Sequence, residues 1–275
     1  MRLAPASRVL GPLLAACTHL VAGHAAAQAS SPESFLAGET ADCAGCDLSG
    51  ADLAGRALHG VDLSRANLQN ANLAASDLSG ANLSDALLFS ADLTEAALSD
   101  ADLSGTDLTE ADLTGAKLTG SRLQRTIFFR STLNLADFTG AVGQGVVFRR
   151  AFLQRARFDN AELRFSEFEN AVLGGASAVE ADLSGSTFRD VTLRGLDMSR
   201  AEVRGADLTG TNLRNATLTG ASFAGSDLYQ ADLEGADLSG ADFSGTRLLA
   251  ANLQHAKIEG TIFTGALMPN GTFHE

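Results

Sequence analysis

From Leu48 to Phe273, every fifth residue belongs to one row that is almost entirely apolar. Of the 46 positions in this central row, 44 are Leu, Phe, Met, Val or Ile, and the two exceptions, Gly143 and Ala178, keep the spacing. A step of five residues rotates by about 140° on an α-helix and alternates faces on a flat strand, so neither element would gather these side chains on one side. The row therefore predicts a solenoid that bends by about a quarter turn per repeat and points each central side chain at a common axis.

The other positions of the repeat agree with this prediction. Two residues before each central residue, 28 of the 46 positions are Ala, which suits a second inward row in a densely packed interior. Asp or Asn often precedes the central residue, Ser or Thr often follows it, and Gly is frequent at the fifth position, as in Ala231-Asp232-Leu233-Glu234-Gly235. These residue types suit exposed backbone that turns tightly.

The pattern resembles the A(D/N)LXX consensus of the pentapeptide-repeat family over residues 43–275. The resemblance implies an all-β fold, a right-handed quadrilateral parallel β-helix with four repeats per coil and about eleven coils in this chain. A coil of twenty residues should pair bulky central side chains at spacings of twenty, and of ten across the core. Three series have these spacings: Phe128, Phe148, Phe168 and Phe188; Phe138 and Phe158; and Phe223, Phe243 and Phe263.

The first 29 residues have the pattern of a signal peptide. Arg2 and Arg8 flank the start of an apolar run, and Ala27-Gln28-Ala29 fits a small-x-small cleavage site. We expect an exported protein, periplasmic or extracellular. In the alternative interpretation, Leu14-Ala15-Ala16-Cys17 is a lipobox and the chain is anchored through a lipidated Cys17. No later apolar run approaches about 20 residues, so we expect no transmembrane helix in the mature chain.

Residues 30–42 are expected to cap the first coil. Ser31, Pro32 and Gly38 are typical of a short helix, and Phe35 and Leu36 could cover the open end of the array. The C-terminal residues show no equivalent pattern. We therefore expect an uncapped C-terminal end that is available for homodimerisation, as in some members of the family.

The mature chain keeps two cysteines, Cys43 on the central row and Cys46 on the alanine row. Both should point into the first coil, as buried thiols or as a local disulfide. Many family members open with a similar Cys-x-x-Cys lead-in. No other Cys or His pair completes a zinc site, so we expect no metal and no cofactor.

Nothing in the sequence predicts catalytic residues. His59, His255 and His274 fall on outward rows of different coils, and the repeat consensus accounts for the many Ser and Thr residues. Acids such as Asp92 and Asp112, one coil apart, are interpreted as solvent-exposed side chains without a binding role. An array without insertions supplies no lid or cleft, so we expect that the protein is not an enzyme.

Charge is distributed unevenly along the array. The net charge is −13, and it becomes −15 when Arg2 and Arg8 leave with the signal. Residues 42–120 carry 13 acids and 3 bases, and residues 166–275 carry 15 acids and 7 bases. Between them, residues 121–165 hold eight arginines and three acids. This basic belt also contains Gly143, where the missing side chain predicts a constriction or kink.

One wall of the expected helix carries outward apolar residues with arginines beside them, which is the composition of a protein interface. Drift of outward residues explains the pattern equally simply. The candidate interaction patch comprises Leu87, Phe89, Ile127, Phe129, Arg130, Val147, Arg149, Arg150 and Arg155.

Two functions remain for such a rod. The first is an exported structural or protein-interaction module with an unknown protein partner and no nucleic-acid partner. The alternative is a DNA mimic, since some pentapeptide-repeat proteins resemble duplex DNA and protect gyrase. The acidic charge fits mimicry in sign. The export signal and the basic belt favour the first function.

Overall fold

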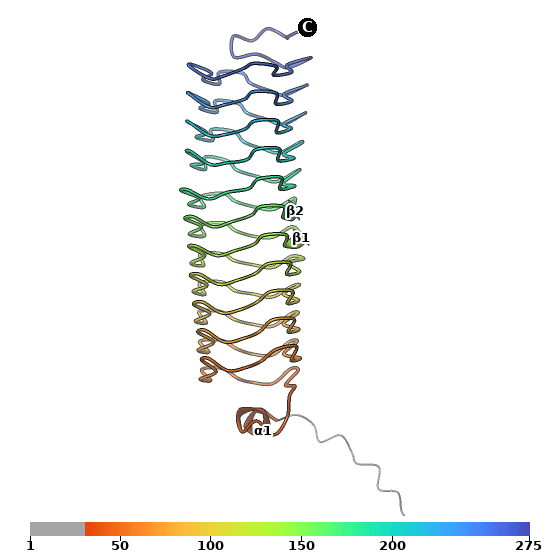
Figure 1. Cartoon of the computed structure of the whole chain (residues 1–275), viewed down its shortest axis with the longest axis vertical. Coiled ribbons are helices and arrows are strands. Elements are labelled where there is room, and N and C mark those ends of the chain that lie inside the picture. The colour runs from red at the N-terminus through yellow and green to blue at the C-terminus, as the bar shows by residue number, and fades with distance from the viewer. Residues whose placement is uncertain (1–30) are drawn as a thin grey trace, which may run out of the picture.

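The computed structural model describes residues 31–275, which wind into a rod of stacked coils (Figure 1). The predicted signal peptide, its cleavage site and Cys17 lie outside the described residues. Among the described residues, no helix has the length and apolar character needed to cross a membrane.

Successive coils are related by twenty residues. Parallel bridges join Asp47 to Asn67 and continue with the same spacing up to the pair of Arg247 and Leu267. The predicted four pentapeptides per coil are therefore confirmed. Within the described chain, only β1 (Val142–Gln144) and β2 (Glu162–Arg164) extend to three-residue strands, and they pair in parallel.

Each pentapeptide ends in a turn, so a coil has four sides. We name the walls by their first central residue: wall A begins at Leu48, wall B at Leu53, wall C at Leu58 and wall D at Leu63. Each wall then takes every twentieth central residue. β1 and β2 lie on wall D.

Hydrogen bonds explain the repeat consensus. In the first repeat, the Oδ1 atom of Asp47 accepts from the backbone N–H of Ser49 at 3.1 Å. The carbonyl of Leu48 accepts from the N–H of Ala51 at 3.0 Å, which closes the turn. Gly50, between them, has φ +66°, the left-handed region that favours glycine. The recurring acids therefore shape the turns, a role beyond the solvation expected from sequence.

The interior is filled by the central row and the alanine row. All three predicted phenylalanine ladders are confirmed. Rings of Phe128 and Phe148 stack at 5.2 Å, and Phe138 meets Phe148 edge to face at 5.6 Å across the core. Where Thr replaces Ala, its hydroxyl is satisfied by a carbonyl: Thr106 Oγ1 donates to Leu83 O at 2.7 Å.

A short helix precedes the first coil at the N-terminal end. Helix α1 (Pro32–Leu36) begins after Ser31, whose side chain accepts from the N–H of Ser34. The helix lies beyond the first coil in Figure 1, and Phe35 is buried. The guanidinium of Arg56 lies 5.4 Å from the Phe35 ring centroid and donates to Phe35 O at 3.2 Å. These contacts tie the helix to the array.

Cys43 and Cys46 are both buried in the first coil and form a disulfide in the structure. The backbone N–H of Cys43 donates to Asp62 O at 2.8 Å, and Cys46 O accepts from the N–H of Asn67 at 2.8 Å. The bridge therefore closes the first repeat where no earlier coil supports it.

The C-terminal end differs from expectation. Phe273 does not continue the central row: it is 73% exposed and pairs antiparallel with Leu267. The N–H of Gly265 donates to His274 O at 2.8 Å, so the chain returns across one side of the last coil. The cause is the turn sequence Pro269-Asn270-Gly271, in which Gly271 has φ +86°. The expectation of a bare end is therefore wrong on this side, while Ile258 and Ile262 stay exposed.

Candidate interaction surface

The edge between walls A and B carries the best-ordered part of the predicted patch. The Phe129 ring centroid lies 5.8 Å from the guanidinium carbon of Arg130 and 5.9 Å from that of Arg149. Arg130 pairs with Glu110 at 3.0 Å, and Arg149 pairs with Glu167 at 3.1 Å. Both cations are thereby held beside the ring.

Arg150 borders the same edge and has no ion pair with any residue between 31 and 275. Together with Phe129, Arg149, Glu169 and Asn170 it lines a shallow hollow of about 450 Å³. One carboxylate oxygen of Glu169, Oε2, is buried with no hydrogen-bond partner. The hollow combines an aromatic surface with groups of both charges.

The structure brings together only part of the predicted patch. Ile127 and Val147 are half-buried neighbours on wall A, adjacent to this edge. Leu87 and Phe89 are exposed but lie on an earlier coil, separated from Ile127 by Asp107 in the same ladder. Arg155 lies at another edge, between walls B and C. Six of the nine residues therefore form one surface.

Other exposed apolar side chains were missed by the sequence analysis. They lie on walls B and D of the same middle coils: Leu135, Val142, Phe152, Phe165 and Val172. The sequence contains the information needed to predict these positions, because the same twenty-residue step assigns both central and outward residues to a wall. The apolar residues of the predicted patch were taken from wall A alone, so the patch did not include the apolar residues of walls B and D.

The basic belt is largely neutralised by acids on the same or adjacent coils. Arg122, Arg130, Arg149, Arg157 and Arg164 each have a carboxylate within 4.0 Å. Asp182 pairs with Arg164 at 2.6 Å; burial raises its pKa, but hydrogen bonds from Ser184 and Arg164 outweigh burial and lower it. The same pair raises the pKa of Arg164. Among the residues that the structure describes, no carboxylate lies within 4.0 Å of the belt arginines Arg125, Arg150 and Arg155.

At Gly143, the predicted constriction takes the form of a close approach between coils. A Cβ atom on Gly143 would lie 2.7 Å from the carbonyl carbon of Leu123 on the preceding coil. The coils continue in register on both sides, since Arg122 pairs with Val142 and Val142 with Glu162. Only glycine fits this position without displacing backbone.

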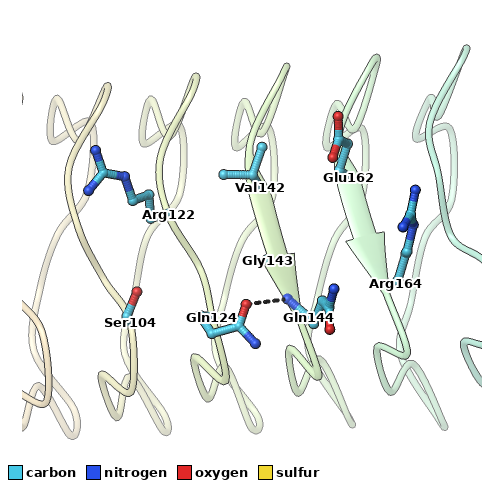
Figure 2. A pocket seen from close by; sticks show the side chains of 8 residues that line it. All are labelled: Ser104, Arg122, Gln124, Val142, Gly143, Gln144, Glu162 and Arg164. Atoms are coloured by element: carbon cyan, nitrogen blue, oxygen red, sulfur yellow. Dashed lines mark hydrogen bonds between the residues drawn. The ribbon is translucent and has the colours of Figure 1, made fainter.

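A hollow of about 250 Å³ lies outside Gly143 on wall D (Figure 2). Figure 2 shows Gln124 beside Gln144, whose backbone N–H donates to Gln124 Oε1 at 3.2 Å. Arg122 and Arg164 border the hollow, but each is engaged by an aspartate, and Glu162 lies between them. The two arginines of the lining are thus paired with nearby aspartates, and the exposed Val142 adds an apolar side chain.

Chemistry-bearing residues elsewhere stay apart. His59, His255 and His274 are exposed: His59 lies near the N-terminal end, and His255 and His274 lie at the C-terminal end, where the backbone of His274 bonds to Gly265 and Ala266. Asp92 and Asp112 are bridged neighbours, but each accepts from the backbone N–H of its own turn, Thr94 or Thr114, at 2.9 Å. In residues 31–275, no three His, Cys, Asp or Glu side chains gather as a metal-ligand group.

Comparison with solved structures finds pentapeptide-repeat proteins. HetL of the cyanobacterium Nostoc sp. strain PCC 7120, described as involved in regulating heterocyst differentiation, is 29% identical; the match covers 88% of this chain and 97% of HetL with a TM-score of 0.48. A thylakoid-lumen pentapeptide-repeat protein of Arabidopsis thaliana is 32% identical over 38% of this chain and 69% of its own, with a TM-score of 0.29.

The fluoroquinolone-resistance protein QnrB1 is 17% identical over 76% of this chain and 90% of its own, with a TM-score of 0.37. Comparison with curated proteins finds no match. The family model "Pentapeptide repeats (8 copies)" matches overlapping windows that together run from residue 46 to residue 265. The chain therefore belongs to the pentapeptide-repeat family.

Proposed function

We propose that the chain is a non-enzymatic, exported interaction module that presents the surface of its β-helix to another protein. Family membership supports this class, since a regular array of coils builds surface rather than an enclosed site. The single observation that carries the proposal is the edge at Phe129.

At this edge, an aromatic ring is fixed before any partner arrives. Arg130 and Arg149 flank Phe129, and each cation is tethered by its own glutamate. A prearranged aromatic group with arginines beside it is the composition that dominates binding energy at protein interfaces. Little side-chain entropy is left to lose on docking.

The test is co-purification from the cell-envelope fraction with the full chain as bait. Phe129→Asp combined with Arg149→Glu should abolish capture of the partner without lowering the melting temperature, because both side chains point outward. A matched control lies on the same column of turns: the guanidinium of Arg247 lies 4.4 Å from the Tyr229 ring centroid. Tyr229→Asp with Arg247→Glu should leave capture intact. Retained capture in the first variant, or equal loss in the second, would contradict the proposal.

Export rests on the sequence of residues 1–29. Mass spectrometry of the mature N-terminus separates cleavage near Ser30 from a diacylated Cys17, the lipid-anchored alternative. The net charge of −15 after cleavage favours DNA mimicry as a second candidate function. An uncleaved chain found in the cytoplasm would support mimicry over the exported module.

Homodimerisation through the C-terminal coils is part of the proposal. The exposed side chain of Ile258 supports it, because this residue extends the central row to an end that the C-terminal return covers on one side only, and Ile262 adds an exposed apolar side chain on the outer face of wall D. Light scattering at micromolar concentration tests it, and a strictly monomeric species would exclude it.

A further inference from the structure

Wall B changes character in the middle of the rod. Its outward ladder begins with acids such as Asp92 and Asp112 and becomes acidic again at Asp232. Between them, bridges connect five neighbours that carry no charge: Thr132, Phe152, Val172, Thr192 and Asn212. Phe152 is 47% exposed and Val172 38% exposed, and Leu135 on the adjoining turn is 55% exposed. These residues make a continuous uncharged stripe on wall B, with the exposed apolar side chains of Leu135, Phe152 and Val172 at its centre.

Unpaired arginines surround this stripe. Arg150 and Arg155 occupy the two turns that bound the pentapeptide carrying Phe152, and Arg194 lies on the same wall two coils on. In residues 31–275, eleven of eighteen Lys and Arg side chains have a carboxylate within 4.0 Å. None of these three does. The guanidinium groups are therefore free to pair with a ligand.

The open area extends past these arginines. Space around Gly174 is clear, since an added Cβ would meet nothing within 4 Å. We call residues 130–135, 150–155, 170–175 and 190–195 the wall B face. Its charged residues are Arg130, Arg150, Arg155, Arg194 and Asp190, and the Asp190 carboxylate lies over Gly210 of the next coil. The face is thus positive on a rod that is acidic at both ends.

Two of these arginines have a backbone conformation that is unfavourable for residues other than glycine. Arg150 and Arg155 both have φ +58°, in a turn position that glycine fills on many coils and that 23 non-glycine residues occupy in the described chain. A non-glycine residue in this region is less favourable than glycine because its Cβ crowds the following carbonyl oxygen. Neither side chain recovers that cost through an ion pair within the described chain. The backbone conformation alone therefore does not single out these two arginines, but a change to glycine at either position introduces no strain.

We propose that the wall B face docks an acidic segment of a partner protein, in which carboxylates flank an apolar side chain. The proposal rests on the interaction function proposed above and assigns the partner's chemistry. Arginine forks bind carboxylates in bidentate fashion, and Phe152 and Val172 receive the apolar group. Five residues separate Arg150 from Arg155, at most about 17 Å of extended chain, so carboxylates a few residues apart on an extended segment reach both.

Charge also sets where such a segment binds. The coils before and after the belt carry net charges of −10 and −8, from 13 acids against 3 bases and from 15 against 7. An acidic segment is repelled from both ends and attracted at the centre. This arrangement fixes the register of docking along an otherwise repetitive rod.

The experiment uses the full mature chain and a synthetic peptide in which paired aspartates flank a Phe-Val core. Binding is measured by fluorescence anisotropy at low and high salt. Arg150→Gly with Arg155→Gly should weaken binding at least tenfold while the melting temperature stays level or rises, because glycine suits φ +58°. Arg125→Gly is the matched control: the same substitution, the same φ of +58° and an equally unpaired arginine, but on the edge between walls D and A.

Equal weakening by Arg125→Gly would overturn the proposal, because general charge would then explain binding. Equal affinity for a peptide with asparagine in place of aspartate would also overturn it. So would an anionic vesicle or a single-stranded oligonucleotide that binds the face more tightly than the peptide. If Phe129→Asp with Arg149→Glu abolishes capture of the envelope partner and the double glycine variant does not, the interaction function stands and the wall B face is excluded.

Discussion

The close approach at Gly143 makes a quantitative prediction about Gly143→Ala. The added methyl group would lie 2.7 Å from the carbonyl carbon of Leu123 and 2.8 Å from its oxygen, whereas ordinary contact begins at 3.4 Å. The neighbouring atoms are backbone and cannot rotate away. The two coils must therefore separate by about 0.7 Å, the difference between 3.4 and 2.7 Å.

That separation falls on the ladder between the coils. The N–H of Leu123 donates to Val142 O at 2.8 Å, and the N–H of Arg125 donates to Gln144 O at 2.9 Å. Both bonds stretch to the limit of useful geometry and lose roughly 1 kcal/mol each. Overpacking strain adds about 1–3 kcal/mol. We expect a total loss of about 3–5 kcal/mol in the free energy of unfolding.

The assay is thermal unfolding together with amide hydrogen exchange. For a chain of this size about 1 kcal/mol shifts the melting temperature by 2–4 °C, so a decrease of roughly 6–20 °C is expected. Exchange at Leu123 and Arg125 should accelerate first. Gly174→Ala is the control, because its Cβ meets nothing within 4 Å and its φ is not positive. If Gly143→Ala unfolds within a degree of this control, the steric reasoning is refuted.

Two further predictions concern the core and the turns. Leu153→Asp places a charge in a fully buried position and should cost several kcal/mol, seen as loss of the cooperative thermal transition, whereas Gln154→Asp on the exposed neighbour should be nearly neutral. Asp237 has its pKa lowered to about 2 by hydrogen bonds from Ser239 and Lys257. Because a lowered pKa in the folded state stabilises above the unfolded value and is lost below it, stability should fall between about pH 4 and pH 2. Asp237→Asn should flatten that part of the profile in melting curves recorded across this range, and an unchanged profile would contradict the assignment.

The period of five was enough to predict the coils, the inward rows and all three phenylalanine ladders. Only a coil of four pentapeptides buries the residue at every fifth position throughout the repeat. Central residues twenty apart then lie on adjacent coils of one wall, so Phe148 contacts Phe128 and Phe168. The N-terminal helix was predictable from Ser31 and Pro32 for similar local reasons. The reversal of the chain at the C-terminus was not predicted, because Phe273 keeps the five-residue spacing of the central row. The turn sequence Pro269-Asn270-Gly271 was the indication of this reversal.

The candidate surface was harder to predict because outward residues obey no packing rule. Phe129 and Arg149 lie close together because they occupy one column of turns. Phe152 was overlooked because its exposure depends on what the next coil carries, Val172 and the bare Gly174. Ion pairing was equally hidden: whether Arg164 is free depends on an aspartate 18 residues away.

The twenty-residue register also determines how such a chain can change length. Removing one pentapeptide would rotate everything after it by about a quarter turn and bring every later side chain onto a different wall. The stripe from Thr132 to Asn212 would then be cut at the deletion. Removing four pentapeptides together would shorten the rod by roughly 4.8 Å, the spacing of paired strands, and leave every face aligned. Only the insertion, deletion or exchange of whole coils therefore preserves the alignment of the side chains along each wall.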